Sequence, residues 1–400
     1  MTLPAHIEAL LKPEAYLERP GSIELIQTHI SYIILTPRFV YKIKKPVNFG
    51  FLDFTTLEKR KHFCEAEIRL NQRLTEGIYL EVVPIVETIE GGFRIFASEM
   101  EAVVAGHTAK PIDYAVMMTR FDENSTLKAL ILKDRADAEL IKRIARRIAK
   151  FHREAETGEH ISEFGEMKII EKNILENFSQ TVEFIGPILS KDKYDLIKKF
   201  SVTFLKDNGS LFKRRIDGGF IKDCHGDIHS EHVSVTKKIN IIDCIEFNER
   251  FRFSDVASDL AFLSMDLDFL SRNDLSRELE EEYFNQTKDK DGKALTGFYK
   301  AYRAYVRGKV ECFKLLETEV GAREKHRAKL EAMRHFHLAG QYAEGGFKPM
   351  LTVVSGLPGS GKSTVATLLH KENNANILNS DVVRKEIHNI DPYSDEKAAF

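Results

Sequence analysis

A glycine-rich segment of the phosphate-binding loop type stands at residues 356–363, in the order Gly-Leu-Pro-Gly-Ser-Gly-Lys-Ser. It follows the apolar, β-branched run 351–355, which predicts a buried parallel strand, and it precedes a predicted helix over 364–370. Glycines let backbone N–H groups turn inward around phosphate oxygens, and the N-terminus of the following helix adds a positive dipole. The loop lysine reaches the β- and γ-phosphates of ATP, and the next hydroxyl binds Mg²⁺.

We therefore expect this loop to bind ATP and Mg²⁺, with Lys362 on the phosphates and Ser363 as a ligand of the metal. The residues expected to contact the nucleotide are Gly356, Gly359, Ser360, Gly361, Lys362, Ser363 and Thr364.

A second group of polar residues lies at 224–233, in the run Cys-His-Gly-Asp-Ile-His-Ser-Glu-His-Val. It precedes the apolar run 239–242, which predicts a strand that ends at Asp243. Two acidic residues in such a strand-rich segment suit phosphoryl transfer, in which one aspartate orients the acceptor hydroxyl and the other holds Mg²⁺ on the phosphates. Asp227 and Asp243 are the pair that we expect to do this.

The order His-Gly-Asp-x-His followed by an Ile-Asp strand resembles the aminoglycoside phosphotransferase family, whose members are relatives of the protein kinases. Further segments that look like this family are found at 40–47, 51–54, 67–71, 243–248, 255, 259–261 and 302–307. The resemblance runs from about residue 23 to residue 337. With the P-loop that follows, the whole chain resembles bacterial two-domain proteins described as aminoglycoside phosphotransferase-like with an ATP-binding domain.

The resemblance implies a role for each matching residue. Asp227 would be the catalytic aspartate and Asp243 the metal-binding aspartate. Lys42 would be the strand lysine that contacts the α- and β-phosphates of ATP. Lys44 is the alternative, because alternation along a strand leaves the register open.

The same resemblance implies the surroundings of that lysine. Glu67 would be the helix carboxylate that pairs with it, and Glu65 is the second choice. Residues 117–120 would form the hinge beside adenine. Asp255 and Asp259 would brace the catalytic loop rather than take part in the chemistry.

Two departures from the family pattern bear on the metal and on the nucleotide. The family has an asparagine, a second Mg²⁺ ligand, where this chain has His232. Imidazole can ligate a metal, but Mg²⁺ prefers oxygen, so the second metal ligand and the identity of the metal stay open. The loop expected to cover the nucleotide, 28–33, contains no glycine, which makes a close approach of its backbone to the phosphates less assured.

Beyond the P-loop, an apolar run at 377–378 leads to Asp381, and Arg384 follows. A strand that ends in aspartate with a nearby arginine resembles the small-substrate P-loop kinases of the polynucleotide-kinase and zeta-toxin types. By that resemblance, Asp381 would orient or deprotonate the acceptor hydroxyl and Arg384 would hold the acceptor. The alternative is an aspartate that caps the N-terminus of a surface helix.

Hydrophobic periodicity and turn residues predict the elements that carry these motifs. We expect strands at 30–35, 39–43, 79–90 and 93–100, a helix at 56–74, mainly helices beyond residue 115 with one at 140–153, a strand-rich segment at 221–247, and helices again to 337. The stretch 339–346, with three glycines, reads as a linker.

The fold class predicted from this order is a two-lobed α+β protein-kinase-like domain followed by the start of an α/β P-loop domain. Its parts would be a kinase-like N-lobe at 1–114, a helical C-lobe at 115–337, a linker at 338–348 and the P-loop segment at 349–400. A P-loop core needs more strands, a second acidic Mg²⁺ ligand and an arginine-bearing lid. We therefore expect the chain to be a fragment of a longer one whose P-loop half binds nucleotide poorly.

Composition narrows the class of protein. The 400 residues are 43% hydrophobic and 30% charged with a net charge of −2, which favours neither nucleic acid nor a membrane as partner of the first domain. The four cysteines form no CxxC pair, and the sequence shows no signal peptide and no membrane span. We expect a cytoplasmic protein that acts on a small-molecule phosphoryl acceptor, in an oligomeric state that the sequence does not define.

Two alternatives remain open at this stage. The first domain could be a degenerate kinase that senses ATP without transferring phosphate. The cluster could instead ligate Zn²⁺ or Mn²⁺ in a metal-dependent hydrolase through His225, Asp227, His229, His232 and Asp243.

A cationic acceptor such as an aminoglycoside would need a surface rich in acidic residues in the helical region. Such residues are available in the sequence at Asp266, Asp268, Glu278, Glu280, Glu281 and Glu282, although runs of this kind are usually solvated helix faces.

Overall fold

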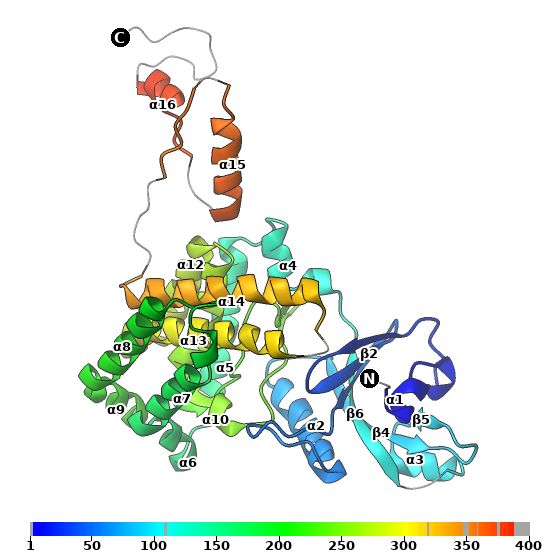
Figure 1. The fold of residues 1–400 in the computed structure, drawn as a ribbon. Helices are drawn as coiled ribbons and strands as arrows, with labels where there is room; N and C mark the ends of the chain where they lie inside the picture. Colours follow the sequence, from blue (N-terminus) through cyan, green and yellow to red (C-terminus); the bar gives the residue numbers. More distant parts are fainter. Residues whose placement is uncertain are drawn as a thin grey trace.

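The computed structural model describes residues 3–107, 110–317, 320–346, 352–357, 359–373 and 377–387. Figure 1 shows a sheet-containing lobe beside a larger helical lobe. The sheet has six strands in the order β1-β2-β3-β6-β4-β5, and every neighbouring pair is antiparallel. The strands are β1 Glu24–Gln27, β2 Ser31–Leu35, β3 Phe39–Lys44, β4 Tyr79–Glu87, β5 Phe93–Ile95 and β6 Pro111–Thr119.

Alternation along β3 sends its side chains to opposite faces of the sheet. Tyr41 and Ile43 join the apolar cluster that also contains Ile7 and Leu10 around the short helix α1 (Ala5–Ala9). The lysines at 42 and 44 therefore share the other face, where α2 (Leu57–Asn71) packs against β4 and β6. Thr56 caps the N-terminus of α2, since its side chain accepts a hydrogen bond from the N–H of Lys59.

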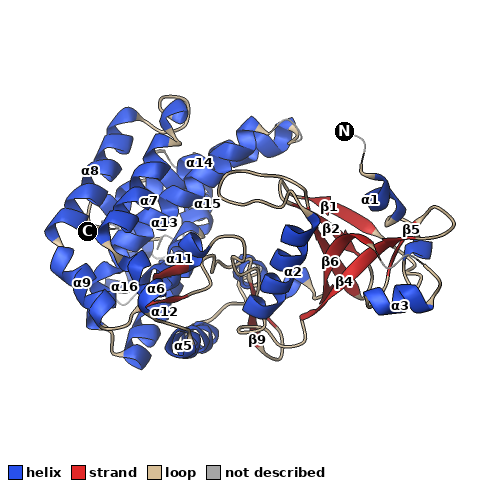
Figure 2. Cartoon of the chain, turned by 90° about the horizontal axis from the view of Figure 1, so that it is seen from below, coloured by secondary structure: helices blue, strands red, loops and turns tan. Residues whose placement is uncertain are grey.

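Helices make up most of the second lobe, as the secondary-structure colours of Figure 2 show. They are α4 Leu127–Leu132, α5 Ala138–Glu154, α6 Glu159–Ser162, α7 Met167–Ser179, α8 Lys191–Asp207, α9 Gly209–Asp217, α10 Glu249–Arg252, α11 Val256–Phe269, α12 Asn273–Thr287, α13 Lys290–Leu316 and α14 Ala322–Ala343. Helix α11 is apolar around most of its circumference, as a helix enclosed by protein must be. It gives Ala257 and Met265 to one apolar core and Leu260 and Leu267 to another.

Two short antiparallel pairs hold the loops between the lobes. One joins β7 (Ile221–Asp223) to β10 (Phe253–Asp255), and the other joins β8 (Val233–Val235) to β9 (Ile239–Ile241). The loop at 224–232 runs from β7 to β8, and the loop at 242–248 follows β9. The predicted strand-rich segment thus serves mainly to fix the ends of two loops.

Most predicted elements of the first lobe are present, and two of its boundaries were wrong. The strand predicted at 93–100 ends at Ile95, because Ser98 caps the helix α3 (Glu99–Val104) by accepting from the N–H of Glu101. The boundary drawn between residues 114 and 115 falls inside β6, which pairs with β3 as far as Thr119 and with β4 as far as Met118. The remaining domain limits stay a prediction.

The linker predicted to begin at 338 was also placed wrongly. Helix α14 continues to Ala343, and Leu338, Ala339 and Tyr342 are buried in a core of the helical lobe. A hydrogen bond from the Tyr342 hydroxyl to Asp268 Oδ2 measures 2.5 Å. Small residues at 339 and 340 therefore serve close helix packing rather than chain flexibility.

The C-terminal segment contains α15 (Lys362–Asn373) and α16 (Ser380–Ile387), which lie beyond α14 in Figure 1. The helix predicted after the P-loop is thus present. Neither residues 352–357 nor 377–379 form a strand, contrary to both strand predictions here. A strand needs a neighbour to satisfy its N–H and C=O groups, and Val353 and Leu378 are 76% and 77% exposed. Within the described ranges, no helix combines the length and apolar character that crossing a lipid bilayer requires.

Candidate active site

Lys42 joins three segments that are far apart in the chain. Its Nζ lies 2.8 Å from Oε1 of Glu67 on α2 and 2.7 Å from Oδ1 of Asp243 after β9. The Lys42 and Glu67 side chains are 14% and 0% exposed, whereas that of Asp243 is 43% exposed. Burial alone would lower the pKa of Lys42, but the carboxylates of Asp243 and Glu67 outweigh it and hold that pKa well above its usual value. The lysine is therefore a cation where the sheet of the first lobe meets the loop after β9.

Lys44 occupies the same face of β3, one pleat further along. Its Nζ lies 2.7 Å from Oε2 of Glu67, and it also pairs with Glu246. Thus both lysines share one carboxylate, but only Lys42 reaches Asp243. Glu65, the second choice for the helix carboxylate, is exposed on α2. Glu246 was missed by the sequence analysis, although it lies only three residues after Asp243.

The catalytic-loop candidate, 225–227, is held by Asp259 of α11. The two carboxylate oxygens of Asp259 accept the N–H of His225 at 3.0 Å and the N–H of Gly226 at 2.8 Å. His152 Nε2 lies 3.1 Å from the same carboxylate. Burial would raise the pKa of Asp259, but its interactions with His152 and His225 outweigh burial and lower it to about 2. The family resemblance implied that Asp259 braces the catalytic loop, and these hydrogen bonds join Asp259 to His225 and Gly226 of that loop.

Gly226 has a φ of 88°, a conformation that favours glycine, and an added Cβ would lie 2.8 Å from the carbonyl oxygen of Phe251. His225 is fully buried, and the N–H of Asp227 donates to its Nδ1 at 3.3 Å. Burial lowers the pKa of His225 to about 4, so its ring is neutral. This histidine therefore shapes the loop that presents Asp227.

His232 lies between the two candidate acidic residues. Its Nδ1 is 2.9 Å from the carbonyl oxygen of Asp227, and its Nε2 is 3.6 Å from Oδ2 of Asp243. Only a protonated Nδ1 can donate to a carbonyl, and burial, together with the nearby His229, lowers the pKa of His232. In the resulting neutral tautomer the Nε2 lone pair faces Asp243.

These donors fit a divalent cation. Asp243 supplies carboxylate oxygen and His232 supplies imidazole nitrogen, a set that suits Mn²⁺ as well as Mg²⁺. A second grouping is also present, because ligand atoms of Asp227, His229 and His232 all lie within 4.8 Å of one another. Asp227 is therefore a member of the second grouping, and His232 belongs to both.

The loop that carries Asp243 is anchored to the first lobe. Asp243 has a φ of 63°, and its N–H donates to the Tyr79 hydroxyl at 3.1 Å. The next N–H, of Cys244, donates to Oδ1 of Asn71 at 2.9 Å. Neither Tyr79 nor Asn71 was assigned a role from the sequence, although Asn71 ends the family-like segment 67–71.

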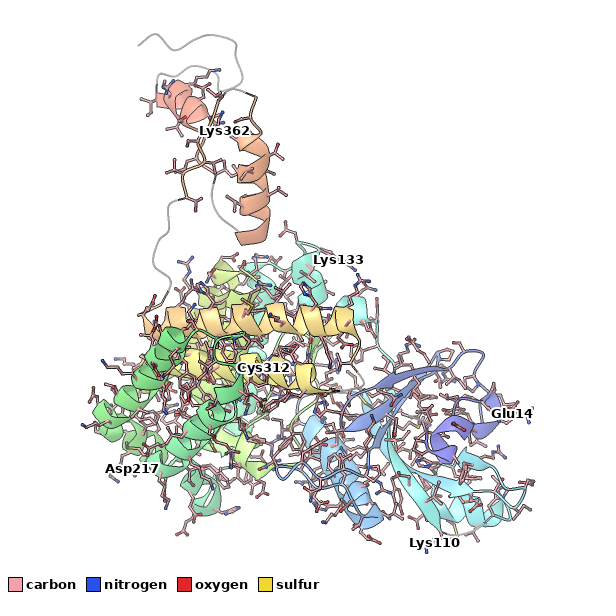
Figure 3. All side chains as sticks on the ribbon, viewed as in Figure 1. Glu14, Lys110, Lys133, Asp217, Cys312 and Lys362 are labelled. Carbon is pink, nitrogen blue, oxygen red and sulfur yellow. The ribbon has the colours of Figure 1, made fainter. Side chains whose placement is uncertain are left out.

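The P-loop residues lie around the start of α15, and Figure 3 labels Lys362 there. Gly359 and Gly361 have φ values of 76° and 84°, conformations that glycine adopts readily. Lys362 Nζ donates to the carbonyl oxygen of Leu357 at 2.8 Å. Gly356, Ser360, Ser363 and Thr364 also belong to this described part of the chain.

Asp381 lies in the first turn of α16, not at the end of a strand as predicted. Its N–H donates to Oδ1 of Asn379 at 2.9 Å, so Asn379 is the residue that caps this helix. Arg384 Nη1 lies 3.4 Å from Oδ1 of Asp381. The structure brings the predicted aspartate and arginine together, and their roles stay a prediction.

Most of the acidic residues suggested as partners of a cationic acceptor are already paired with neighbouring residues. All of them except Glu281 have cationic or N–H partners. The contacts are Asp268 and Glu280 with Lys300 at 2.6 and 2.8 Å, Glu278 with Lys142 at 3.2 Å, Glu282 with Arg146 at 2.7 Å, and Asp266 with the N–H of Ser230 at 2.8 Å. The acidic run and the basic face of α5 therefore form a helix–helix contact.

A surface cavity of about 500 Å³ lies elsewhere, between the loop after β3 and the start of α2. Its lining includes Phe51, Phe63 and Phe247, and none of Lys42, Asp227 or Asp243 lines it. We assign no role in the chemistry to this cavity.

The chain has a two-lobed, kinase-like fold and a C-terminal P-loop segment, as expected from the sequence. A family model described as an AAA domain matches residues 351–399. The chain belongs to the family of the uncharacterized protein Rv2004c of Mycobacterium tuberculosis, with which it shares 30% identity over 366 residues. The match covers 91% of this chain and 68% of the relative, and the uncharacterized protein Mb2027c of Mycobacterium bovis matches to the same extent.

Solved structures with a similar chain path include several kinases. A choline/ethanolamine kinase family protein from Mesorhizobium loti has a TM-score of 0.44 at 13% identity, covering 80% of this chain and 92% of its own. A choline kinase from Streptococcus pneumoniae has a TM-score of 0.41 at 16% identity, with coverages of 83% and 96%. A spectinomycin phosphotransferase, in complex with ADP and spectinomycin, has a TM-score of 0.41 at 14% identity, with coverages of 86% and 98%.

Proposed function

We propose that the kinase-like domain transfers the γ-phosphate of ATP to a hydroxyl group of a small molecule. The observation that carries this proposal is the position of Lys42 Nζ, within 2.8 Å of carboxylates from α2 and from the loop after β9. A phosphotransferase needs a cation for the phosphates, a carboxylate to position that cation and a second carboxylate for the metal. Lys42, Glu67 and Asp243 have the chemistry for these three roles.

Asp227 is the candidate catalytic residue. Burial would raise its pKa, but His229 and His232 outweigh burial and hold that pKa far below its usual value, so the side chain is a carboxylate. A carboxylate can accept a hydrogen bond from the acceptor hydroxyl and aim its oxygen at the γ-phosphorus. A bond forms between that oxygen and phosphorus while the bond from phosphorus to the β–γ bridging oxygen breaks. Asp227 orients the hydroxyl and takes up its proton as the new bond to phosphorus forms.

Lys42 has three N–H donors, and two of them are directed to Glu67 and Asp243. The third can reach the phosphates of ATP while Glu67 keeps the ammonium in place. Asp243 and His232 would hold the divalent cation, which when bound would neutralise phosphate charge. Tyr79 and Asn71 keep the Asp243 loop against the first lobe during this binding.

We also propose that the P-loop segment is a second ATP-binding module of the kinase type. Lys362 would bind the phosphates and Ser363 the Mg²⁺, while Asp381 and Arg384 would serve a second acceptor. The matched AAA family model and the left-handed glycines of the loop support nucleotide binding here.

One observation favours a metal-dependent hydrolase as a second candidate for the first site. Asp227, His229 and His232 bring three ligand atoms within 4.8 Å of one another. A hydrolase, however, would leave the Lys42–Glu67–Asp243 contact without a purpose. Metal analysis of the purified protein distinguishes the two, since a hydrolase of this kind retains stoichiometric tightly bound zinc.

The test of the proposed function is a phosphoryl-acceptor screen with Mg²⁺-ATP on the full chain, run beside Asp227→Asn and Lys362→Ala. We expect Asp227→Asn to lose transfer by the kinase-like domain and to keep ATP binding at the P-loop. Lys362→Ala should keep that transfer. Unchanged transfer in Asp227→Asn would overturn the assignment, and ATP binding without transfer in the wild type would favour an ATP-sensing role.

A further inference from the structure

Helices α7, α10 and α13 meet at a group of polar side chains that the reaction above does not use. Arg250 of α10 forms an ion pair with Glu176 of α7. Lys309 of α13 donates to Oδ1 of Asn177 at 2.5 Å and to Oε1 of Gln180 at 2.9 Å. We name these five residues the α7–α13 cation site.

The cation site holds more positive than negative charge. It contains two cations and one carboxylate, and the groups that accept hydrogen bonds from Lys309 are the neutral amides of Asn177 and Gln180. Burial lowers the pKa of Lys309 to about 8; Glu176 opposes this effect and the nearby Arg250 adds to it. Among the described residues, Nε of Arg250 is buried without a hydrogen-bond partner. A buried donor of this kind costs free energy unless an acceptor reaches it.

Two residues outside the cation site, on the helices that carry its cations, contact the catalytic loop. The carbonyl of Phe251, the residue after Arg250, packs against Gly226 so closely that a Cβ there would lie 2.8 Å from it. From α13, Arg303 donates to the carbonyl oxygen of Gly226 at 3.1 Å. Helices α10 and α13, which carry the two cations, thus both touch the residue that precedes Asp227.

Further positive charge on α13 lies toward Asp227. Arg307 follows Arg303 by one helical turn, so it projects from the same side of the helix. Its guanidinium is among the charges that lower the pKa of Asp227. The acidic residues of the helical lobe that could attract a cationic acceptor are, by contrast, mostly engaged in the α5–α12 and Lys300 contacts described above.

We propose that the α7–α13 cation site binds an anionic group of the phosphoryl acceptor, a phosphate or a carboxylate, while the acceptor hydroxyl lies at Asp227. This inference rests on the proposed function and names the class of its substrate: a hydroxylated anion, not an amino sugar or another amine. Lys309 and Arg250 would donate to the anion, and such charge-assisted hydrogen bonds are about twice as strong as neutral ones. The acceptor would thereby be oriented at two points.

Four ligands that share one scaffold test this proposal: glucose, glucose 6-phosphate, glucuronate and glucosamine. Their binding to the full chain, saturated with Mg²⁺-ADP, is measured by calorimetry for the wild type and for Lys309→Gln and Arg250→Gln. The matched control is Lys213→Gln, since Lys213 is a 76% exposed lysine of α9. Melting temperatures show whether each variant is folded.

We expect glucose 6-phosphate or glucuronate to bind at least about tenfold more tightly than glucose, and the order of these two to show which anion the site prefers. Lys309→Gln and Arg250→Gln should remove that preference, and Lys213→Gln should keep it. Three results would overturn the proposal. Glucosamine could bind more tightly than glucose, the wild type could show no preference for the anions, or both site variants could keep the preference of the wild type.

The failure of the proposed function would look different. In that case the anion preference and its dependence on Lys309 would persist, but no acceptor and no water would receive the γ-phosphate of ATP. Transfer of phosphate to glucosamine in preference to the anionic sugars would instead leave the function intact and contradict the substrate class.

Discussion

The Nζ atom of Lys42 lies 2.7 Å from Oδ1 of Asp243, although 201 residues separate the two in the chain. The contact joins the sheet of the first lobe to the loop after β9. Glu67 also contacts Lys42, and its two carboxylate oxygens accept hydrogen bonds from Lys42 and Lys44. Lys42, Lys44, Glu67 and Asp243 are therefore coupled, and the two lysines should have separable roles.

The first prediction concerns Lys44. Its side chain is 1% exposed, and Lys44→Met leaves Glu67 with one partner fewer and Glu246 without its lysine. Removing one member of a buried ion pair costs about 3–5 kcal/mol, so the free energy of unfolding should fall by about that amount. Urea denaturation measures it.

Lys42→Met is the matched comparison. The Asp243 partner of Lys42 is 43% exposed and can be solvated, so the loss of stability should be smaller than for Lys44→Met. Phosphoryl transfer, however, should fall by about a hundredfold or more in kcat/KM, as expected for a preorganised charge that contacts the reacting phosphates. Equal effects of both substitutions on stability and on transfer would show that the lysines are interchangeable.

The second prediction concerns the metal. His232→Asn replaces an imidazole nitrogen with an amide oxygen between Asp227 and Asp243. Because Mg²⁺ prefers oxygen ligands and Mn²⁺ accepts nitrogen more readily, the ratio of activity with Mn²⁺ to activity with Mg²⁺ should fall by about tenfold. Metal titrations of the transfer rate measure this ratio. The exposed His326→Asn on α14 is the control, and an unchanged ratio in His232→Asn would remove His232 from the metal site.

The third prediction is a pH dependence of stability. The pKa of Asp259 is lowered to about 2 in the folded protein, from an ordinary value of 3.8. As pH falls below about 4 the unfolded state takes up the proton first, so the stabilising contribution is present above pH 4 and is lost as pH approaches 2. The shift corresponds to about 2 kcal/mol.

Asp259→Asn should therefore be less stable than the wild type near pH 6, and the gap in unfolding free energy should narrow between pH 4 and pH 2. Denaturant titrations over this range provide the comparison. A gap that stays constant would mean that the ionised carboxylate does not brace His225 and Gly226.

The fourth prediction tests the end of α14. Tyr342→Phe removes the hydroxyl that donates to Asp268, which also pairs with Lys300. Loss of a buried hydrogen bond to a charged group should lower the free energy of unfolding by about 1.5–3 kcal/mol. Thermal unfolding of the full chain measures this. If the region were the linker that its glycines suggested, the substitution would leave the unfolding transition where it was.

The resemblance of short motifs to a known family predicted the two-lobed fold and the Lys42–Glu67 pair, both of which are present. It could not distinguish Lys42 from Lys44, since residues two apart on a strand share a face and only the tertiary contact with Asp243 separates them. Glu246 was missed for the same reason, because nothing local marks a glutamate that will meet a buried lysine from another lobe.

Two further differences between sequence and structure concern the glycine at 340 and the acidic residues of α12. Gly340 looked like part of a linker, but its absent side chain makes room for the Lys193 stem, 3.3 Å from where a Cβ would be. The acidic residues at 278 and 282 were given as possible partners of a cationic acceptor or as part of a solvated helix face. They are covered by Lys142 and Arg146 of α5, an arrangement that depends on how two distant helices pack.

The most direct test of the Lys42–Glu67–Asp243 site is calorimetry of the full chain with Mg²⁺ and a non-hydrolysable ATP analogue, in a Lys362→Ala background that disables the P-loop. We predict one binding event per chain, weakened at least about tenfold by Lys42→Met and unaffected by Lys168→Met at a 77% exposed position. Nucleotide affinity that is the same with and without Lys42 would contradict the account.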